Sequence, residues 1–311
     1  MRKKLKLSLT KLSSDFAGFC LSGLGRPFGI GRDSIGNYYI TDMDLNTVFR
    51  LSPKLDFISF LSDDHPFWQP EYSITSTPIE ININPHSLLH GPHALDFDAM
   101  GNIFVTTYYT PKIQVFARDG RYIKTIGNYF LQGPASSFFN HKKEYLLISE
   151  YCKNAILKVS KEGEYLGGIG LSDANHLCPE FQLTHTFKAS TIIGAFDRPH
   201  MIKESPDGIL YCADTWNHRI QTFQLSGNVL DEITHKRLKH PVAVTFSNHQ
   251  ELVVTSWSNN SLLYFDLEGS FIKEITHLNI NCPYDAQFYH PWLIVLDSHG
   301  GNVLFIDPDQ Y

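Results

Sequence analysis

Six prolines in this chain each open a short apolar run. A second apolar run follows, closed by a small or acidic residue 14 to 16 residues after the proline. The prolines are Pro27, Pro92, Pro134, Pro199, Pro241 and Pro283. The closing residues are Asp42, Thr107, Glu150, Asp214, Ser256 and Asp297. Repetition at this period predicts six copies of one small sheet.

The fourth copy shows the pattern most fully. Pro199 opens its first run, Asp207-Gly208 forms a turn, Asp214 closes the second run, and a third alternating run follows, which together predict three antiparallel strands. Asn217-His218-Arg219-Ile220 resembles the name motif of the NHL repeat family. The resemblance implies an all-β, six-bladed β-propeller, in which radial repetition protects the sheet edges. We expect one propeller domain over residues 1–311, with blades that start near residues 27, 92, 134, 199, 241 and 283.

Extra chain lies around these copies. Leu5, Leu7 and Leu9 alternate with polar residues, so we predict that residues 4–10 form a strand outside residues 302–306, complete the sixth blade and close the ring. The intervals between prolines are 42 residues in three cases and 65 in two, which indicates insertions at about 62–90 and 171–197. Chain direction places both on the face where the residues after the prolines lie, and long loops of this kind are typical lids or binding loops.

Composition narrows the partners and the compartment. The net charge of -6 gives no basic footprint, so nucleic acid is not expected as a partner, although some NHL relatives bind RNA. The five cysteines are odd in number and form no CxxC pair, which favours reduced thiols and a cytoplasmic protein. The sequence contains no run of about 18 apolar residues, so we predict no membrane span. The charged N-terminus lacks the apolar core of a signal peptide.

The residues after the six prolines alternate between apolar or small and polar: Phe28, His93, Ala135, His200, Val242 and Tyr284. The polar ones come from alternate blades, so we expect them to converge on the propeller axis. Carboxylates end four of the second strands: Asp42, Glu150, Asp214 and Asp297. Imidazoles backed by carboxylates suit a Zn-type site, because the carboxylate keeps the ring nitrogen neutral and aimed. The alternative is structural, with Asp42, Asp214 and Asp297 capping polar turns and the two histidines facing channel water.

Several short segments also resemble the peptidylglycine amidating lyases, six-bladed propellers whose Zn ligands are histidines that follow proline in alternate blades. Pro92-His93 and Pro199-His200 match two ligand segments, and Pro283-Tyr284-Asp285 matches the third, with Tyr in place of His. The resemblance implies Zn or a similar divalent metal at His93, His200 and Tyr284, and a structural Ca ion at Asp285. It also makes Tyr151, next to Glu150, the counterpart of the catalytic tyrosine. The family's blade 1 arginine has no match here.

Two hypotheses follow. The first is a metal-dependent enzyme, of lyase or hydrolase type, that acts on a small molecule or modified peptide in a central pocket. Tyr151 and Glu150 would be catalytic, and the pocket would include Asp42, Asp214, Trp216, Trp257 and Asp297; no organic cofactor is expected. The second is a non-catalytic scaffold that binds a protein or RNA on the same face, with Trp216 and Trp257 as an aromatic rim.

Overall fold

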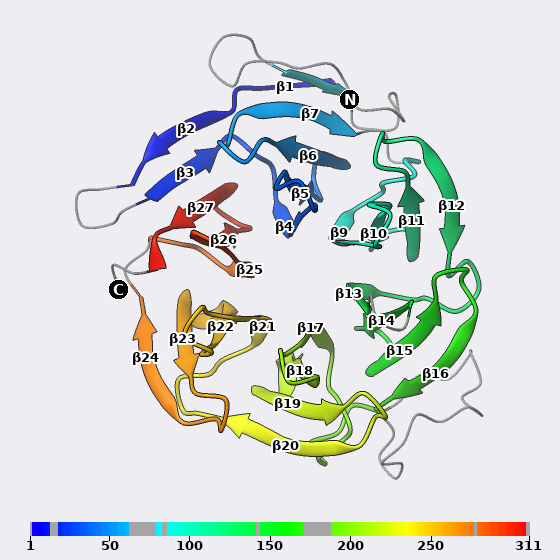
Figure 1. The fold of residues 1–311 in the computed structure, drawn as a ribbon, viewed down its shortest axis with the longest axis vertical. Helices are drawn as coiled ribbons and strands as arrows, with labels where there is room; N and C mark the ends of the chain where they lie inside the picture. The colour runs from blue at the N-terminus through cyan, green and yellow to red at the C-terminus, as the bar shows by residue number, and fades with distance from the viewer. Residues whose placement is uncertain are drawn as a thin grey trace. The chain divides into compact units, whose positions relative to one another are not determined.

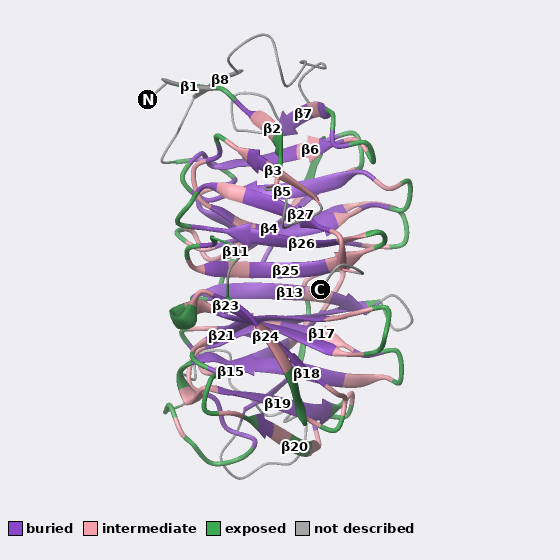
Figure 2. Ribbon diagram, turned by 90° about the vertical axis from the view of Figure 1, so that its left-hand side faces the viewer, coloured by how far each residue is buried: buried purple, intermediate pink, exposed green. Residues whose placement is uncertain are grey.

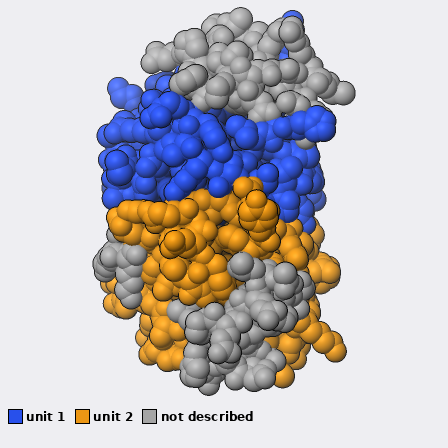
Figure 3. Space-filling model, turned by 90° about the vertical axis from the view of Figure 1, so that its right-hand side faces the viewer, with its two compact units in different colours: residues 1–125, 280–311 blue, residues 126–279 orange. Residues whose placement is uncertain are grey.

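The computed structural model describes residues 2–12, 18–61, 79–82, 86–140, 144–170, 188–276 and 279–308. The chain divides into two compact units (Figure 3). Unit 1 holds residues 1–125 and 280–311, and unit 2 holds residues 126–279. We call each sheet that starts at one of the six prolines a blade, and number the blades in chain order.

Unit 1 contains blades 1, 2 and 6. Blade 1 is β4 (Pro27–Arg32), β5 (Tyr38–Asp42), β6 (Thr47–Leu51) and β7 (Phe57–Leu61). Blade 2 is β9 (Pro92–Phe97), β10 (Ile103–Thr107), β11 (Lys112–Phe116) and β12 (Tyr122–Ile126). Blade 6 is β25 (Pro283–Tyr289), β26 (Trp292–Asp297) and β27 (Asn302–Ile306), extended by β3 (Gly18–Ser22) and β2 (Ser8–Lys11).

Unit 2 contains blades 3, 4 and 5. Blade 3 is β13 (Pro134–Asn140), β14 (Tyr145–Glu150), β15 (Ala155–Ser160) and β16 (Tyr165–Ile169). Blade 4 is β17 (Pro199–Glu204), β18 (Ile209–Asp214), β19 (Arg219–Gln224) and β20 (Val229–Thr234), with the short helix η1 (Thr215–Asn217) between β18 and β19. Blade 5 is β21 (Pro241–Phe246), β22 (Leu252–Ser256), β23 (Ser261–Phe265) and β24 (Phe271–Ile275), with η2 (Trp257–Asn259).

The predicted blade register is confirmed in all six copies. Each proline is the first residue of its strand and pairs with the predicted closing residue, from Pro27 with Asp42 to Pro283 with Asp297. Proline suits this place because the first residue of a strand needs no N–H for the ladder.

The N-terminal segment completes blade 6 as expected, but through a different strand. Residues 18–22 of β3 pair with β27, and β2 lies outside β3 (Figure 1). The prediction that residues 4–10 pair directly with residues 302–306 is therefore wrong. Residues 2–5 of β1 instead pair with β8 (Ile79–Asn82), which belongs to the first insertion. Both N-terminal stretches alternate, and Phe19 and Leu21 lie opposite Phe305 and Val303 in the ladder.

Apolar faces of neighbouring blades pack against each other within each unit, and the central strands are almost wholly buried (Figure 2). In unit 1, Tyr38 and Phe49 of blade 1 share a cluster with Phe305 of blade 6. In unit 2, Phe196, Phe223 and residues of blade 3 form a comparable cluster. This packing gives the first strands a rigid support, on which the candidate site residues are carried.

Candidate functional site

The residue after each proline leaves the strand ladder. In every blade the register between the first and second strands shifts directly after the proline, as at a β-bulge. A bulge re-aims a side chain and is common beside active sites. The six positions that we expected to carry the site are therefore distinguished by their backbone, as well as by their sequence.

In unit 1 these positions form an aromatic cluster around His93. The Tyr284 hydroxyl lies 3.0 Å from His93 Nε2, and the Phe28 ring packs 4.7 Å from the His93 ring and 4.2 Å from the Tyr284 ring, between centroids. Tyr108 stacks on His93. The His93 carbonyl accepts a bond of 2.7 Å from Thr41, which fixes this strand against blade 1. His93 and Tyr284 thus form a hydrogen-bonded pair in a largely apolar setting.

In unit 2 the corresponding cluster contains Tyr151, Arg198 and His200. The rings of Tyr151 and His200 meet edge to face, 5.1 Å between centroids. The Arg198 guanidinium donates to the Tyr151 hydroxyl oxygen at 3.4 Å. His200 Nδ1 lies 3.0 Å from the Thr215 hydroxyl and 3.3 Å from the Arg198 carbonyl, contacts that fix the orientation of the imidazole. Two groups capable of proton transfer therefore lie beside one fixed positive charge.

Arg198 was not among the residues singled out from the sequence. It precedes the proline of blade 4, as Arg26 does in blade 1. An alignment of the six copies marks both as unusual, because the other blades carry Gly91, Gly133, His240 and Cys282 at that place. That comparison could have found Arg198.

The carboxylates that close the second strands are buried and accept hydrogen bonds from backbone amides. Asp42 accepts amide bonds from Gly25, Arg26 and Leu45, and Asp297 accepts them from Asn281 and Gly300. These bonds support the structural alternative for both residues, because a connection that enters a blade must satisfy its donors. Burial raises the pKa of Asp42 to about 6, against the lowering effect of the three amide bonds.

Glu150 follows the same pattern, which its longer side chain did not suggest. Its carboxylate accepts the amides of Gln132, at 3.1 Å, and of Gly133, and it is completely buried. Burial raises the pKa of Glu150 to about 7, opposed by these amides and by the charge of Lys153. The neighbouring Tyr151 is half-buried. The two predicted catalytic residues therefore differ: Glu150 is a buried carboxylate that binds backbone amides, and Tyr151 is half-buried.

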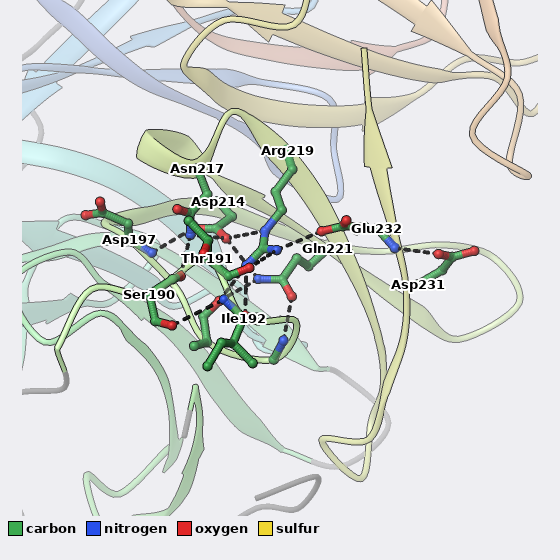
Figure 4. Close-up of polar contacts among 12 residues, drawn as sticks. Ser190, Thr191, Ile192, Asp197, Asp214, Asn217, Arg219, Gln221, Asp231 and Glu232 are labelled. Carbon is green, nitrogen blue, oxygen red and sulfur yellow. Dashed lines mark hydrogen bonds and ion pairs between the residues drawn. The ribbon is translucent and has the colours of Figure 1, made fainter. Parts of the chain in front are cut away.

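Asp214 is the centre of a buried polar network in blade 4 (Figure 4). Its carboxylate accepts Arg219 Nε at 2.7 Å, the Asn217 and Gln221 amides, and the backbone N–H of Asp197. Burial raises the pKa of Asp214, and the bonds from Asp197, Asn217 and Arg219 oppose that rise. Arg219 also donates to the carbonyls of residues 191, 192 and 195. The network thus anchors the described end of the second insertion, which leads directly to Arg198 and His200.

The predicted aromatic rim, Trp216 and Trp257, lies beside the cluster of Tyr151, Arg198 and His200, because the Arg198 guanidinium packs on the Trp216 ring. Trp216 is 44% exposed and packs against His240, which also contacts Trp257. His240 lies 2.7 Å from the Ser258 hydroxyl through Nδ1, and its backbone N–H donates to His218 Nδ1. Burial lowers the pKa of both His218 and His240. The same burial therefore favours the neutral form of the two imidazoles beside Trp216 and Trp257.

The predicted metal centre joins residues from both units, with His93 and Tyr284 in unit 1 and His200 in unit 2. Among the described residues, no group of three or more His, Cys, Asp or Glu is placed to hold a metal ion. Asp285, the expected Ca ligand, accepts the Ile30 amide at 3.0 Å and the Gln287 side chain at 3.1 Å, so it ties blade 6 to blade 1. The metal centre stays a prediction.

The insertion histidines are only partly described. His65, His176 and His185, with Trp68 and Cys178, lie outside the described residues. His86 is exposed, and His90 packs against Tyr109 in unit 1. In the described parts of the chain, no helix has the length and apolar character needed to cross a membrane.

Comparisons with known proteins identify the fold. No family model matches the chain, and no curated protein does. Among solved structures, a streptogramin B lyase matches with TM-score 0.61 and 14% identity, over 99% of this chain and 86% of that one. Virginiamycin B lyase from Staphylococcus aureus matches with TM-score 0.59 and 15% identity, over 99% of both chains. A chain of a nidogen/laminin complex matches with TM-score 0.59 and 16% identity, over 92% of this chain and 98% of that one.

These likenesses, together with the six proline-initiated sheets, show that the chain is an all-β, six-bladed β-propeller, as predicted. At such low identity they establish the fold alone. The similar structures include an enzyme and a protein from a binding complex, so the fold accommodates both hypotheses.

Proposed function

We propose that this chain is an enzyme, of lyase or hydrolase type, that acts on a small molecule or modified peptide bound at the cluster of Tyr151, Arg198 and His200. The observation that carries this proposal is the contact between the Arg198 guanidinium and the Tyr151 hydroxyl oxygen, beside the His200 ring. Acid–base chemistry requires a group that takes a proton and one that gives a proton, both within reach of the bound substrate. A phenol and an imidazole can fill these roles.

In this mechanism Tyr151 transfers the proton at the reacting centre, and His200 serves as the second acid–base group. Arg198 lies next to the Tyr151 oxygen, so its positive charge stabilises negative charge on that oxygen after the proton leaves, or on a substrate oxygen that takes its place. Thr215 and the Arg198 carbonyl hold the imidazole of His200 in one orientation, so reorganisation during the reaction is small.

The lyase neighbours favour elimination over hydrolysis. One of the similar structures is a catalytically inactive virginiamycin B lyase with quinupristin, matched with TM-score 0.60 and 15% identity over 98% of this chain and 99% of that one. Elimination breaks a carbon–heteroatom bond without consuming water, because the proton taken from a carbon or a hydroxyl group of the substrate compensates for the proton given to the leaving group. A hydrolase instead adds the elements of water to its products.

Product analysis tests both the activity and its class. The protein is incubated with quinupristin and with peptides that end in α-hydroxyglycine, in water enriched in heavy oxygen, and the products are analysed by mass spectrometry. The label is scored in the quinupristin product and in the peptide product, because the aldehyde released from α-hydroxyglycine exchanges its oxygen with water in any mechanism. We expect these two products without the label, and a rate that falls about 100-fold or more in Tyr151→Phe. Tyr129→Phe is the control, because Tyr129 is 94% exposed. Equal rates in wild type and Tyr151→Phe would contradict the role of the phenol, and labelled products would identify a hydrolase.

The second candidate function is binding without catalysis, and the exposed Trp216 beside Trp257 favours it. Half-exposed tryptophans suit protein contacts because they supply large apolar area with a polar edge. If the chain binds a partner protein through this rim, Trp216→Ala should weaken that complex while Tyr151→Phe leaves it intact. A complex weakened by Tyr151→Phe and left intact by Trp216→Ala would contradict binding through the rim.

A further inference from the structure

Arg198 and Arg26, its counterpart in blade 1, differ in the groups that surround their charge. Arg26 and Arg198 both precede the first proline of their blade. Arg26 forms an ion pair with Asp44, 2.6 Å between guanidinium and carboxylate. Asp44 stands two residues after Asp42, and the residue two places after Asp214 is Trp216. Blade 4 therefore replaces the carboxylate partner with an indole.

Aromatic rings of the described residues lie against the Arg198 guanidinium. The guanidinium carbon lies 4.3 Å from the centroid of the Trp216 ring and 5.4 Å from that of Tyr151. Among the described residues, no carboxylate lies within ion-pair distance of Arg198. Arg198 is half-buried, so its charge is partly removed from water. Within the described part of the chain, two aromatic rings hold the charge and no carboxylate neutralises it.

The backbone at Arg198 follows the repeat. Its φ is 51°, in the left-handed region, and Gly91, His240 and Cys282 have φ values of 67°, 48° and 63° at the same place in their blades. The conformation is held by the bond from its N–H to the Asn154 side chain, at 2.8 Å, and by the Asp214 network that anchors the segment before it. Because the conformation recurs between blades, what distinguishes Arg198 is its side chain and the rings around it.

We infer that Arg198, between Tyr151 and Trp216, is an oxyanion-binding subsite that takes the carboxylate or phosphate of a ligand with an apolar or aromatic body. The planar guanidinium can bind either oxyanion through two parallel hydrogen bonds. Trp216 is 44% exposed, so the group attached to the oxyanion can pack on its indole. This inference deepens the proposed function and rests on it for the reaction at Tyr151, but binding alone tests the subsite.

The test uses small probes and the intrinsic fluorescence of the full protein. Benzoate and phenyl phosphate are titrated separately, which distinguishes a carboxylate from a phosphate, and benzylamine serves as the cationic probe of similar shape. We expect one or both anions to change the fluorescence saturably and benzylamine to have no effect. Trp216→Phe should remove most of the change. Calorimetry provides the affinity for each variant independently of fluorescence.

Two matched arginine variants make the test specific. Arg198→Met keeps the apolar stem and loses the charge, and we expect it to weaken anion binding 10-fold or more, the range for loss of a charged hydrogen-bond pair. Arg26→Met removes the arginine that Asp44 already neutralises, and we expect binding within about twofold of wild type, since a surface pair contributes little. Thermal unfolding of both variants checks that they remain folded.

The inference is overturned if wild type binds neither anion, if Arg198→Met binds as wild type does, or if Arg26→Met weakens binding equally. Its failure is distinguishable from failure of the proposed function. Anion binding that depends on Arg198, in a protein that turns over none of the substrates above, would support the subsite and contradict the proposed enzyme activity. Turnover that depends on Tyr151, without anion binding, would support the enzyme activity and contradict the subsite.

Discussion

Replacing Arg219 with methionine should destabilise unit 2 strongly, because Arg219 neutralises a completely buried carboxylate. The Arg219 side chain is 5% exposed and that of Asp214 is 0% exposed, with 2.7 Å between the charged groups. Its other ion-pair partner, Glu232, is 30% exposed and can be rehydrated. The variant therefore leaves one buried carboxylate without its cation, and three carbonyls of the segment before Arg198 without their donor.

The expected loss is about 3–5 kcal/mol in the free energy of unfolding at neutral pH, the range for removal of one partner from a buried pair. The loss should shrink as pH falls. Without Arg219, burial raises the pKa of Asp214 further above its unfolded value, and protonation then relieves the uncompensated charge. The electrostatic part of the penalty is thus absent where Asp214 is protonated and grows as pH rises through its folded pKa, whereas the loss of the three bonds to carbonyls is the same at every pH.

Urea unfolding followed by circular dichroism and fluorescence measures this loss. Arg237→Met is the matched control, because Arg237 pairs with Glu274 at 2.8 Å but is 52% exposed. Its expected cost is about 0–1 kcal/mol. Since the chain has two compact units, each probe is fitted for its own transition before the values are compared. An Arg219→Met cost below about 1 kcal/mol, or equal to that of Arg237→Met, would refute the reasoning.

Three further predictions concern pH, metal and the N-terminal strands. Burial raises the pKa of Glu150 from 4.5 to about 7, so its contribution to stability is present below pH 4.5 and is lost as pH rises through about 7; Glu150→Gln should flatten this part of the stability curve, by up to roughly 3 kcal/mol, in urea unfolding at several pH values. If the predicted metal centre forms, elemental analysis should find a stoichiometric divalent ion that His93→Ala and His200→Ala each remove, and a metal-free wild type would contradict it. Deletion of residues 1–23 should expose the β27 edge and cause aggregation in light scattering, whereas deletion of residues 1–6 should not.

The sequence predicted the blade register because proline has few allowed places in a sheet. Alternation alone predicts residues 4–10 as the partner of β27, whereas Gly18–Ser22 occupies that place in the structure. Periodicity shows that one face of a strand is buried, but not which neighbour covers it. The hydrogen bonds to Glu150 could not be predicted from the sequence either, because the amides of Gln132 and Gly133 come close to it only in the folded chain.

The candidate site was predicted in part. The bulge positions, Tyr151 and Trp216 came from the repeat pattern and from the lyase resemblance. Arg198 was missed because its importance depends on Trp216 occupying the place that Asp44 occupies in blade 1. Such a substitution between repeats alters the charge balance of one blade. The sequence contains that information, but only in a comparison of the copies at matched positions.

The most direct test of the central claim, that Tyr151 and Arg198 belong to one site, is to measure kcat and ligand Kd in single variants of each. We expect Tyr151→Phe to lower kcat about 100-fold or more and to change Kd about threefold at most, and Arg198→Met to raise Kd 10-fold or more. Variants that both retain wild-type kcat and Kd would contradict the assignment of this cluster as the site.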